Sequence, residues 1–537
     1  MSTRTSEASL WSADPWMNKR TAPAVATVSF APVVWRLLLG LALIKLAIHL
    51  LSSGLLTYGY MTDELYYLDC ANHLAWGYVD HPPLSIAVLW LVRATLGDSL
   101  VALRLLPALA GGATIVLCGL LARELGGGRA AQGLAGLAAL ISPVYLAVGA
   151  FYSMNAFEPA LWACAAYLLL RLLNGGSPRW WLLLGVVMGL GLLNKISMLW
   201  FGLGLLVGLI MTPQRRWLVT PWPWLAAAIA FVLFAPHIVW QVGNGWPTLE
   251  FMRNAVRYKL PSKSPLTFLG EQVLIMHPFL TPFWLAGLLY YFIDQDGRRF
   301  RLLAWIWIVV FVLLMTSGSA RSNYVGPVYS ILLAAGGVAV ERFARARSWH
   351  WLAPALAGIA AAGGVVILPM AVDLLPPQQY IAYEHAIGLS APTEQVGGSG
   401  VLPIHFALKF HGPAVTRAVA DAYAMLPPED RARAGVLTTS FGEGGAINFF
   451  GRQLGLPHAI GTHNNYWLWG TGGYSGDVML VLTAADSPLL KLFDDVQLAS
   501  PITCEYCMPG QTAKFVYICR RPRHPLSEIW PTLKDYV

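Results

Sequence analysis

The sequence predicts a mainly α-helical protein that crosses a membrane many times and carries a small α/β domain at its C-terminal end. Of its 537 residues, 56% are hydrophobic and 12% are charged, whereas a soluble domain carries about a quarter charged residues. The charges form short clusters between apolar runs of roughly 17–25 residues, the length of a membrane-spanning helix. From about residue 373 the apolar runs shorten, and glycine and proline become more frequent. We therefore divide the chain into a transmembrane domain, residues 31–372, and a soluble domain, residues 373–537.

The N-terminal residues 1–30 are polar and mixed in charge, and we expect them to form a disordered cytoplasmic tail. The apolar run that follows is too long for the core of a signal peptide. We expect 11 spans, at residues 33–56, 100–121, 131–150, 159–173, 181–193, 197–211, 222–240, 272–293, 302–318, 325–340 and 351–372. With the tail inside, most arginines gather in cytoplasmic connections, as the positive-inside rule requires. This topology puts the loop 57–99 and the C-terminal domain outside.

The densest polar cluster of the chain lies in that first outer loop, in the stretch YGYMTDELYYLDCANHLAWGYVDHPPL. Asp63 and Glu64 are explained in part by capping of a helix. A carboxylate that faces an outer cavity can also act as a general base toward a hydroxyl or an amine. Asp80 and His81 precede a rigid Pro-Pro pair and, with Asp63, could bind a divalent cation. The rings of Tyr60, Tyr66 and Tyr67 suit either a membrane interface or a sugar-binding surface.

Further polar residues are expected on the same outer face. Arg257 and Lys259, in the loop 241–271, and Arg321 break the positive-inside pattern. They belong either to solvated loops or to a site for an anion such as a lipid phosphate. Lys195, between the spans 181–193 and 197–211, either snorkels to the interface or contacts a lipid phosphate. Asn155 and Glu158 precede a span and could share the site, and His277, at an outer span end, is a second candidate metal ligand beside Asp80.

The C-terminal domain contains three stretches with the composition of strands, AGVLTTSF, DVMLVLTAA and AKFVYICRR. Cys504, Cys507 and Cys519 all fall in this domain. A single Cys-x-x-Cys pair is weak evidence for a redox or metal site, so we expect a structural disulfide among the three. The apolar composition argues against nucleic acid as a partner, and we find no motif for a soluble nucleotide donor.

Several stretches resemble the family 39 glycosyltransferases, membrane enzymes of the GT-C class that include bacterial relatives of dolichyl-phosphate-mannose-protein mannosyltransferases and of the aminoarabinose transferase of lipid A. The most specific is TDELYYLDCANHLAWGYVDHPPL; others are FYSMNAFEP, GLGLLNKISMLWF, PHIVWQVGNGWPTLEF and ARSNYVGPVYSILLAAGG. The resemblance implies a bacterial inner-membrane enzyme with a periplasmic C-terminal domain. It would transfer a sugar, with inversion, from a polyprenyl-phosphate donor in the membrane to a lipid, glycan or protein acceptor.

The same resemblance implies roles for individual residues. Asp63 would be the base, with Glu64 beside it. Asp80 would hold a divalent metal, the one cofactor expected, and His81 would face the donor phosphate where a relative has lysine. Lys195 matches a family lysine, and Asn155 stands where many relatives carry aspartate.

An alternative function is a polytopic lipid or sugar transporter or flippase, which would also combine many spans with charges in the membrane. Such a protein is expected to contain inverted repeats and charges near the middle of the bilayer. We find no repeat, and the charges gather at outer span ends, which favours an enzyme.

Overall fold

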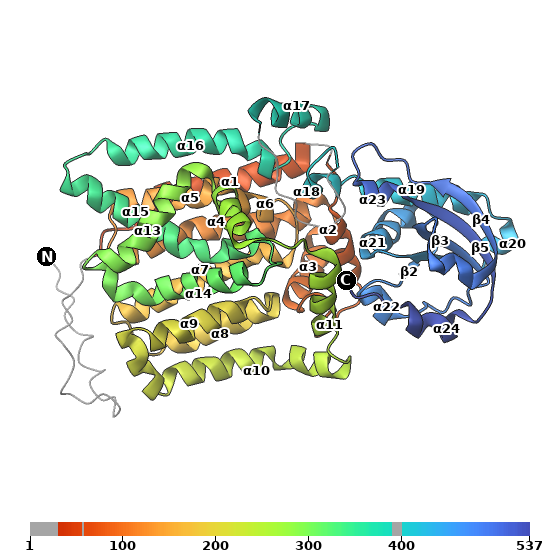
Figure 1. Ribbon diagram of the computed structural model, residues 1–537, viewed down its shortest axis with the longest axis horizontal. Helices are drawn as coiled ribbons and strands as arrows, with labels where there is room; N and C mark the ends of the chain where they lie inside the picture. Colours follow the sequence, from red (N-terminus) through yellow and green to blue (C-terminus); the bar gives the residue numbers. More distant parts are fainter. Residues whose placement is uncertain (1–29, 56–57, 389–399) are drawn as a thin grey trace.

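The computed structural model describes residues 30–55, 58–388 and 400–537, and it contains a helical bundle with a smaller domain at one end (Figure 1). The bundle and the mixed helix-and-sheet domain confirm the predicted fold class. We call the end of the bundle that adjoins the smaller domain the domain end. The tail predicted at residues 1–30 lies outside the described residues, apart from its last position.

Seven helical segments are long and apolar enough to cross a membrane. Their core helices are α1 (Trp35–Leu55), α4 (Leu100–Glu124), α7 (Met154–Leu173), α10 (Trp222–Gly243), α14 (Arg301–Thr316), α15 (Tyr329–Ala346) and α16 (Leu352–Ala371). The chain is therefore a multi-span membrane protein.

Three further candidate spans are broken helix pairs, which raise the number to 10 if each pair crosses once. They are α5 (Arg129–Ile141) with α6 (Pro143–Gly149), α9 (Met198–Ile210) with the 3-10 helix Pro213–Val219, and α12 (Pro265–Met276) with α13 (Thr281–Ile293). The predicted span 272–293 falls on the last of these pairs and is not one continuous helix: the chain bends by 101° at His277–Pro278, where proline cannot continue a helix. α8 (Trp180–Asn194) is a separate apolar helix, as predicted, and the count of 11 stays a prediction.

The loop 57–99 is helical for much of its length, with α2 (Thr62–Cys70) and α3 (Leu84–Leu96). α2 lies between the bundle and the C-terminal domain, and eight of its nine residues are buried. α3 is a short apolar helix that the sequence interpretation treated only as loop. Its Trp90 and Leu91 are exposed, which suits contact with lipid at the domain end.

The C-terminal domain is built on a five-stranded mixed sheet in the order β2-β1-β3-β5-β4. β1 (Gly435–Thr438) pairs in parallel with β2 (Ala459–Gly461) and β3 (Val478–Ala484), and β5 (Lys514–Pro522) pairs antiparallel with β3 and β4 (Phe493–Pro501). β1, β3 and β5 confirm the three predicted strands. The helices of this part are α17 (Pro377–Ile387), α18 (Ile404–Ala407), α19 (His411–Ala424), α20 (Pro428–Arg431), α21 (Phe441–Phe450), α22 (Asn465–Trp469), α23 (Pro509–Thr512) and α24 (Leu526–Ile529).

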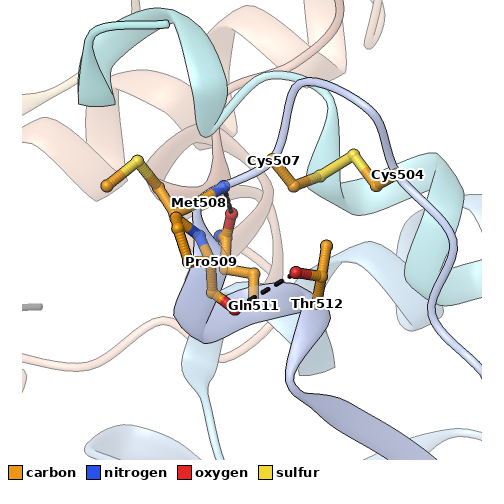
Figure 2. The surroundings of a disulfide bond; sticks show 6 residues. All are labelled: Cys504, Cys507, Met508, Pro509, Gln511 and Thr512. Atoms are coloured by element: carbon orange, nitrogen blue, oxygen red, sulfur yellow. Dashed lines mark hydrogen bonds between the residues drawn. A yellow bond between two sulfur atoms is a disulfide. The ribbon is translucent and has the colours of Figure 1, made fainter. Parts of the chain in front are cut away.

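A disulfide joins Cys504 to Cys507 just before α23 (Figure 2). After it, the Met508 N–H donates to Gln511 Oε1 at 3.1 Å, which starts the short helix. Cys519 is buried in β5 with a free thiol. The expected disulfide is confirmed and lies within the Cys-x-x-Cys pair.

A buried chain of four charges joins the bundle to the C-terminal domain. Arg104 of α4 donates to both oxygens of Glu64 at 2.9 and 2.8 Å. Its other terminal nitrogen lies 3.9 Å from Asp373, just after α16, and Asp373 accepts from Lys409 at 2.7 and 2.5 Å. All four side chains are at most 2% exposed. The end of the bundle and the base of the domain are therefore held by one charge network.

We expect Lys409→Met to destabilise the protein by about 3–5 kcal/mol, because it leaves the buried Asp373 carboxylate without its closest cation. Thermal unfolding in detergent, followed by circular dichroism, measures the effect. The control is Arg523→Ala, which breaks an ion pair whose side chains are 60% and 56% exposed; we expect a change of about 1 kcal/mol or less. Equal effects of the two variants would contradict a network that holds the domain.

Candidate active site

The start of α2 holds two neighbouring carboxylates, Asp63 and Glu64, with different surroundings. Glu64 accepts the Met61 N–H at 2.9 Å, which fixes the first turn of the helix. It also accepts the Tyr152 N–H at 2.8 Å, in addition to the two bonds from Arg104. Both oxygens of Glu64 are thus occupied. The structure gives Glu64 a positioning role and leaves Asp63 as the carboxylate available for chemistry.

Asp63 is partly exposed, and no hydrogen bond to its carboxylate is formed by the residues that the structure describes. Burial raises its pKa above the ordinary value of 3.8, and the charges of Lys259 and Arg321 oppose that rise. The charges of Asp80 and Glu64 also raise the pKa of Asp63. The candidate base therefore shares its surroundings with two cations and a second carboxylate.

Lys259 and Arg321 come from two segments far apart in the sequence. Lys259 ends a π-helical turn, Ala255–Lys259, and burial lowers its pKa, as does the charge of Arg321. Asp63 and Asp80 counteract that shift. The Nε atom of Arg321 is buried and has no hydrogen-bond partner among the described residues. Two close cations, one with a free donor, form an environment suited to a phosphate group.

Lys195 lies between α8 and α9, as predicted, and it contacts two polar residues in the first turns of α7. Its Nζ donates to Asn155 Oδ1 at 2.8 Å and to Glu158 Oε2 at 2.9 Å. The same Nζ lies 4.7 Å from the centre of the Tyr324 ring, three residues after Arg321. The structure therefore brings Lys195 together with Asn155 and Glu158, a contact that the sequence did not predict, and Lys195 is ion-paired.

Asp80 and His81 lie against the tyrosines of α2. The Tyr66 hydroxyl donates to Asp80 Oδ1 at 2.8 Å, and the ring centre of Tyr67 lies 4.6 Å from that of His81. His81 Nδ1 lies 3.1 Å from the carbonyl oxygen of Pro82, which can only accept, so Nδ1 carries the proton.

The other ring nitrogen of His81 is a candidate ligand atom. This Nε2 is buried, lacks a partner among the described residues, and lies 3.8 Å from Asp80 Oδ1. Burial lowers the pKa of His81, so the neutral ring offers a lone pair. A lone pair suits a metal or a hydroxyl donor better than a phosphate oxygen.

The structure provides only part of a metal site. Asp80 and His81 are two potential ligands, and no group of three or more His, Cys, Asp or Glu side chains is found within the described ranges. His277 lies at the break between α12 and α13, against the backbone of Gly363 in α16. None of its described contacts joins it to Asp80. The residues do not form a complete ligand set, and a metal stays a prediction.

Two other predicted site residues face different surroundings. Tyr60 donates to the Asp98 carbonyl oxygen at 2.7 Å and packs on Phe449 of α21. Arg257 is exposed, and its guanidinium lies 5.2 Å from the centre of the Tyr258 ring. Their proposed contacts with substrate or phosphate have no support from the described geometry.

The sequence interpretation missed two residues that the site uses. Arg104 was detectable as a lone arginine near the start of an apolar span, a position that is costly unless the charge is paired. Tyr324 stands in a quoted motif, but its contact with Lys195 joins two segments that sequence cannot place together.

The segment Lys534–Val537 contacts residues 250–259, in the cationic loop that carries Lys259. Lys534 pairs with Glu250 at 2.8 Å, and Asn254 Nδ2 donates to the Tyr536 carbonyl oxygen at 2.8 Å. Lys259 Nζ donates to a main-chain oxygen of Val537 at 3.3 Å. We call this segment the strap, and it connects the C-terminal domain directly to the residues around Asp63.

Comparisons with known proteins agree with this architecture. The family model for dolichyl-phosphate-mannose-protein mannosyltransferases matches residues 80–240. No curated protein sequence matches. The crystal structure of ArnT from Cupriavidus metallidurans in the apo state aligns at 16% identity, with a TM-score of 0.59, over 90% of this chain and 97% of that one. The same enzyme bound to undecaprenyl phosphate aligns at 16% identity, with a TM-score of 0.57, over 91% and 98%. The chain thus has the GT-C fold of ArnT and resembles mannosyltransferases in part of its sequence.

The raised pKa of Asp63 predicts an unusual pH dependence of stability. Asp63 binds its proton more tightly in the folded chain than in the unfolded chain. Its contribution to the free energy of unfolding therefore falls as pH rises from 3.8 through the folded pKa. We expect Asp63→Asn to unfold at a higher temperature than the wild type near neutral pH, with the difference vanishing in acid.

Thermal unfolding across a pH series measures this difference. Asp98→Asn is the control, because the Asp98 carboxylate pairs with Arg93 at 2.6 Å and its loss should not stabilise the protein. A wild type and Asp63→Asn variant with parallel pH curves would contradict the electrostatic description of Asp63.

Proposed function

We propose that the protein is a membrane glycosyltransferase that transfers a sugar from a polyprenyl-phosphate donor to a lipid, glycan or protein acceptor, with Asp63 as the general base. The observation that carries the proposal is the combination at the start of α2: a carboxylate without a hydrogen-bonded partner among the described residues, beside the cations Lys259 and Arg321. The fold of ArnT and the partial match to mannosyltransferases support the same reaction class. The ArnT structure with undecaprenyl phosphate supports the lipid-phosphate part of the proposal.

The proposed reaction is a single displacement at the anomeric carbon. The acceptor oxygen or nitrogen gives its proton to Asp63 as it forms a bond to that carbon. The bond from the same carbon to the phosphate oxygen breaks, and its electron pair stays on the polyprenyl phosphate. Lys259 and Arg321 would stabilise the charge that grows on the leaving phosphate. Attack from the face opposite the leaving group inverts the configuration.

The electrostatics suit this division of roles. Burial raises the pKa of Asp63 above its ordinary value, which makes it a stronger base than a solvated aspartate. Lys195 lies near these cations, because its Nζ contacts the ring of Tyr324, three residues after Arg321. A phosphate group could compete with the Glu158 carboxylate for the ammonium group of Lys195. The proposed divalent cation at Asp80 is not required for any of these steps.

The proposed location is the bacterial inner membrane, with the N-terminus in the cytoplasm and the C-terminal domain in the periplasm. The distribution of arginine between the loops supports this orientation. The disulfide between Cys504 and Cys507 also suits an oxidising compartment.

We expect Asp63→Asn to lower kcat by roughly 10²–10⁴-fold, the usual contribution of a general base. Mass spectrometry of envelope glycans from cells with and without the protein would first identify the transferred sugar, and purified protein would then be assayed with that lipid-linked donor. Asp98→Asn, in the same loop, is the control and should retain activity. A folded Asp63→Asn protein with wild-type kcat would refute the role of the base.

We further expect Lys259→Gln and Arg321→Gln each to weaken use of the donor by about tenfold or more, because each removes a charge-assisted bond to phosphate. Steady-state kinetics with varied donor measure kcat/KM. Arg452→Gln, an exposed cation of the C-terminal domain, is the matched control. If all three variants behaved alike, the two cations would have no specific role in phosphate binding.

A further inference from the structure

The cationic loop near the site contains a helix with two different faces. α11 (Pro247–Asn254) continues without a break into the π-helical turn Ala255–Lys259. Its inner face holds the strap through Glu250 and Asn254 and carries Lys259 toward Asp63.

The outward face is apolar and exposed at helical spacing. Leu249, Met252 and Val256 are 47%, 43% and 55% exposed. They lie at positions i, i+3 and i+7, which fall on one side of a helix. We call these three residues, together with Arg253 and Arg257, the outward face.

The two arginines of the outward face are not neutralised within the protein. Both are exposed, and no carboxylate of the described residues forms an ion pair with either. An exposed apolar stripe flanked by unpaired arginines is the pattern of a helix that lies in a membrane interface. A protein partner of acidic character would not explain why the stripe is apolar.

The position of α11 in the chain supports contact with lipid rather than water. It follows the domain end of the span α10 and precedes α12, and Figure 1 shows it at the end of the bundle beside the C-terminal domain. Exposed apolar residues continue on both sides, at Val239 and Val242 in α10 and at Leu266 in α12. The outward face thus extends the apolar surface of two candidate spans.

We propose that residues 247–259 form an interfacial helix that docks on the bilayer at the domain end, with Leu249, Met252 and Val256 at the acyl boundary and Arg253 and Arg257 bound to anionic lipid headgroups. This docking does not depend on the proposed enzymatic function. It assigns Arg257 to bulk membrane lipid, whereas Lys259, two residues later, faces the site. Each arginine is expected to contribute about a fivefold preference for anionic over neutral lipid.

A nitroxide probe at Met252→Cys tests the insertion in the full-length protein, reconstituted in nanodiscs. The four free cysteines are buried or half-buried, so a labelled wild type provides the background signal. We expect the probe to be relaxed more by oxygen, which partitions into acyl chains, than by a water-soluble nickel chelate. Glu429→Cys, on the exposed α20, is the control and should show the reverse. Leu249→Cys replaces Met252→Cys if that variant unfolds.

Lipid composition tests the headgroup contact. Nanodiscs of phosphatidylcholine alone are compared with nanodiscs that also contain phosphatidylglycerol, for the parent chain and for Arg253→Gln/Arg257→Gln. For the parent chain, we expect the nickel chelate to reach the probe more easily in phosphatidylcholine alone than in the mixture with phosphatidylglycerol. For the double variant, we expect this easier access in both lipids. A probe at 252 that behaves like the probe at 429 would overturn the docking. Insertion that is equal in all four combinations would overturn the role of anionic headgroups.

Discussion

The buried charges of Glu64, Arg104, Asp373 and Lys409 are the interaction on which the architecture depends. Two acids and two bases alternate, so the chain is electrically balanced, and each member would be costly to bury alone. The four side chains come from the first loop, a span, the segment just after α16 and the C-terminal domain. The bundle and the domain therefore define each other's position, and the first turn of α2 is fixed where they meet.

This arrangement separates the acids that have structural partners from the proposed base within a single short helix. Glu64 is committed to Arg104, and Asp69 accepts bonds from Asn448 at 2.6 Å and Tyr466 at 2.5 Å, both in the C-terminal domain. Asp63 lies one residue before the first of these two anchors but has no such partner among the described residues. Both ends of α2 are thus held rigidly while one carboxylate stays available, which is the arrangement expected of a preorganised site.

Much of the fold followed from composition, because apolar runs of membrane length and short apolar strands between turn residues are local signals. The break at Asn194-Lys195 and the strands β1, β3 and β5 were predictable for that reason. The site was predictable as a set of residue types on one face but not as a set of contacts. Arg257 and Lys259 looked equivalent in the sequence, but they lie two positions apart on one helical turn and therefore face different sides.

The strap adds a consequence for the order in which the protein matures. Residues 534–537 are synthesised after every span, yet they hold the loop that carries Lys259. Because domains generally fold as they emerge, the bundle can insert and fold before this contact exists. The loop that carries Lys259 therefore reaches its final arrangement only after the C-terminal domain has folded against the bundle.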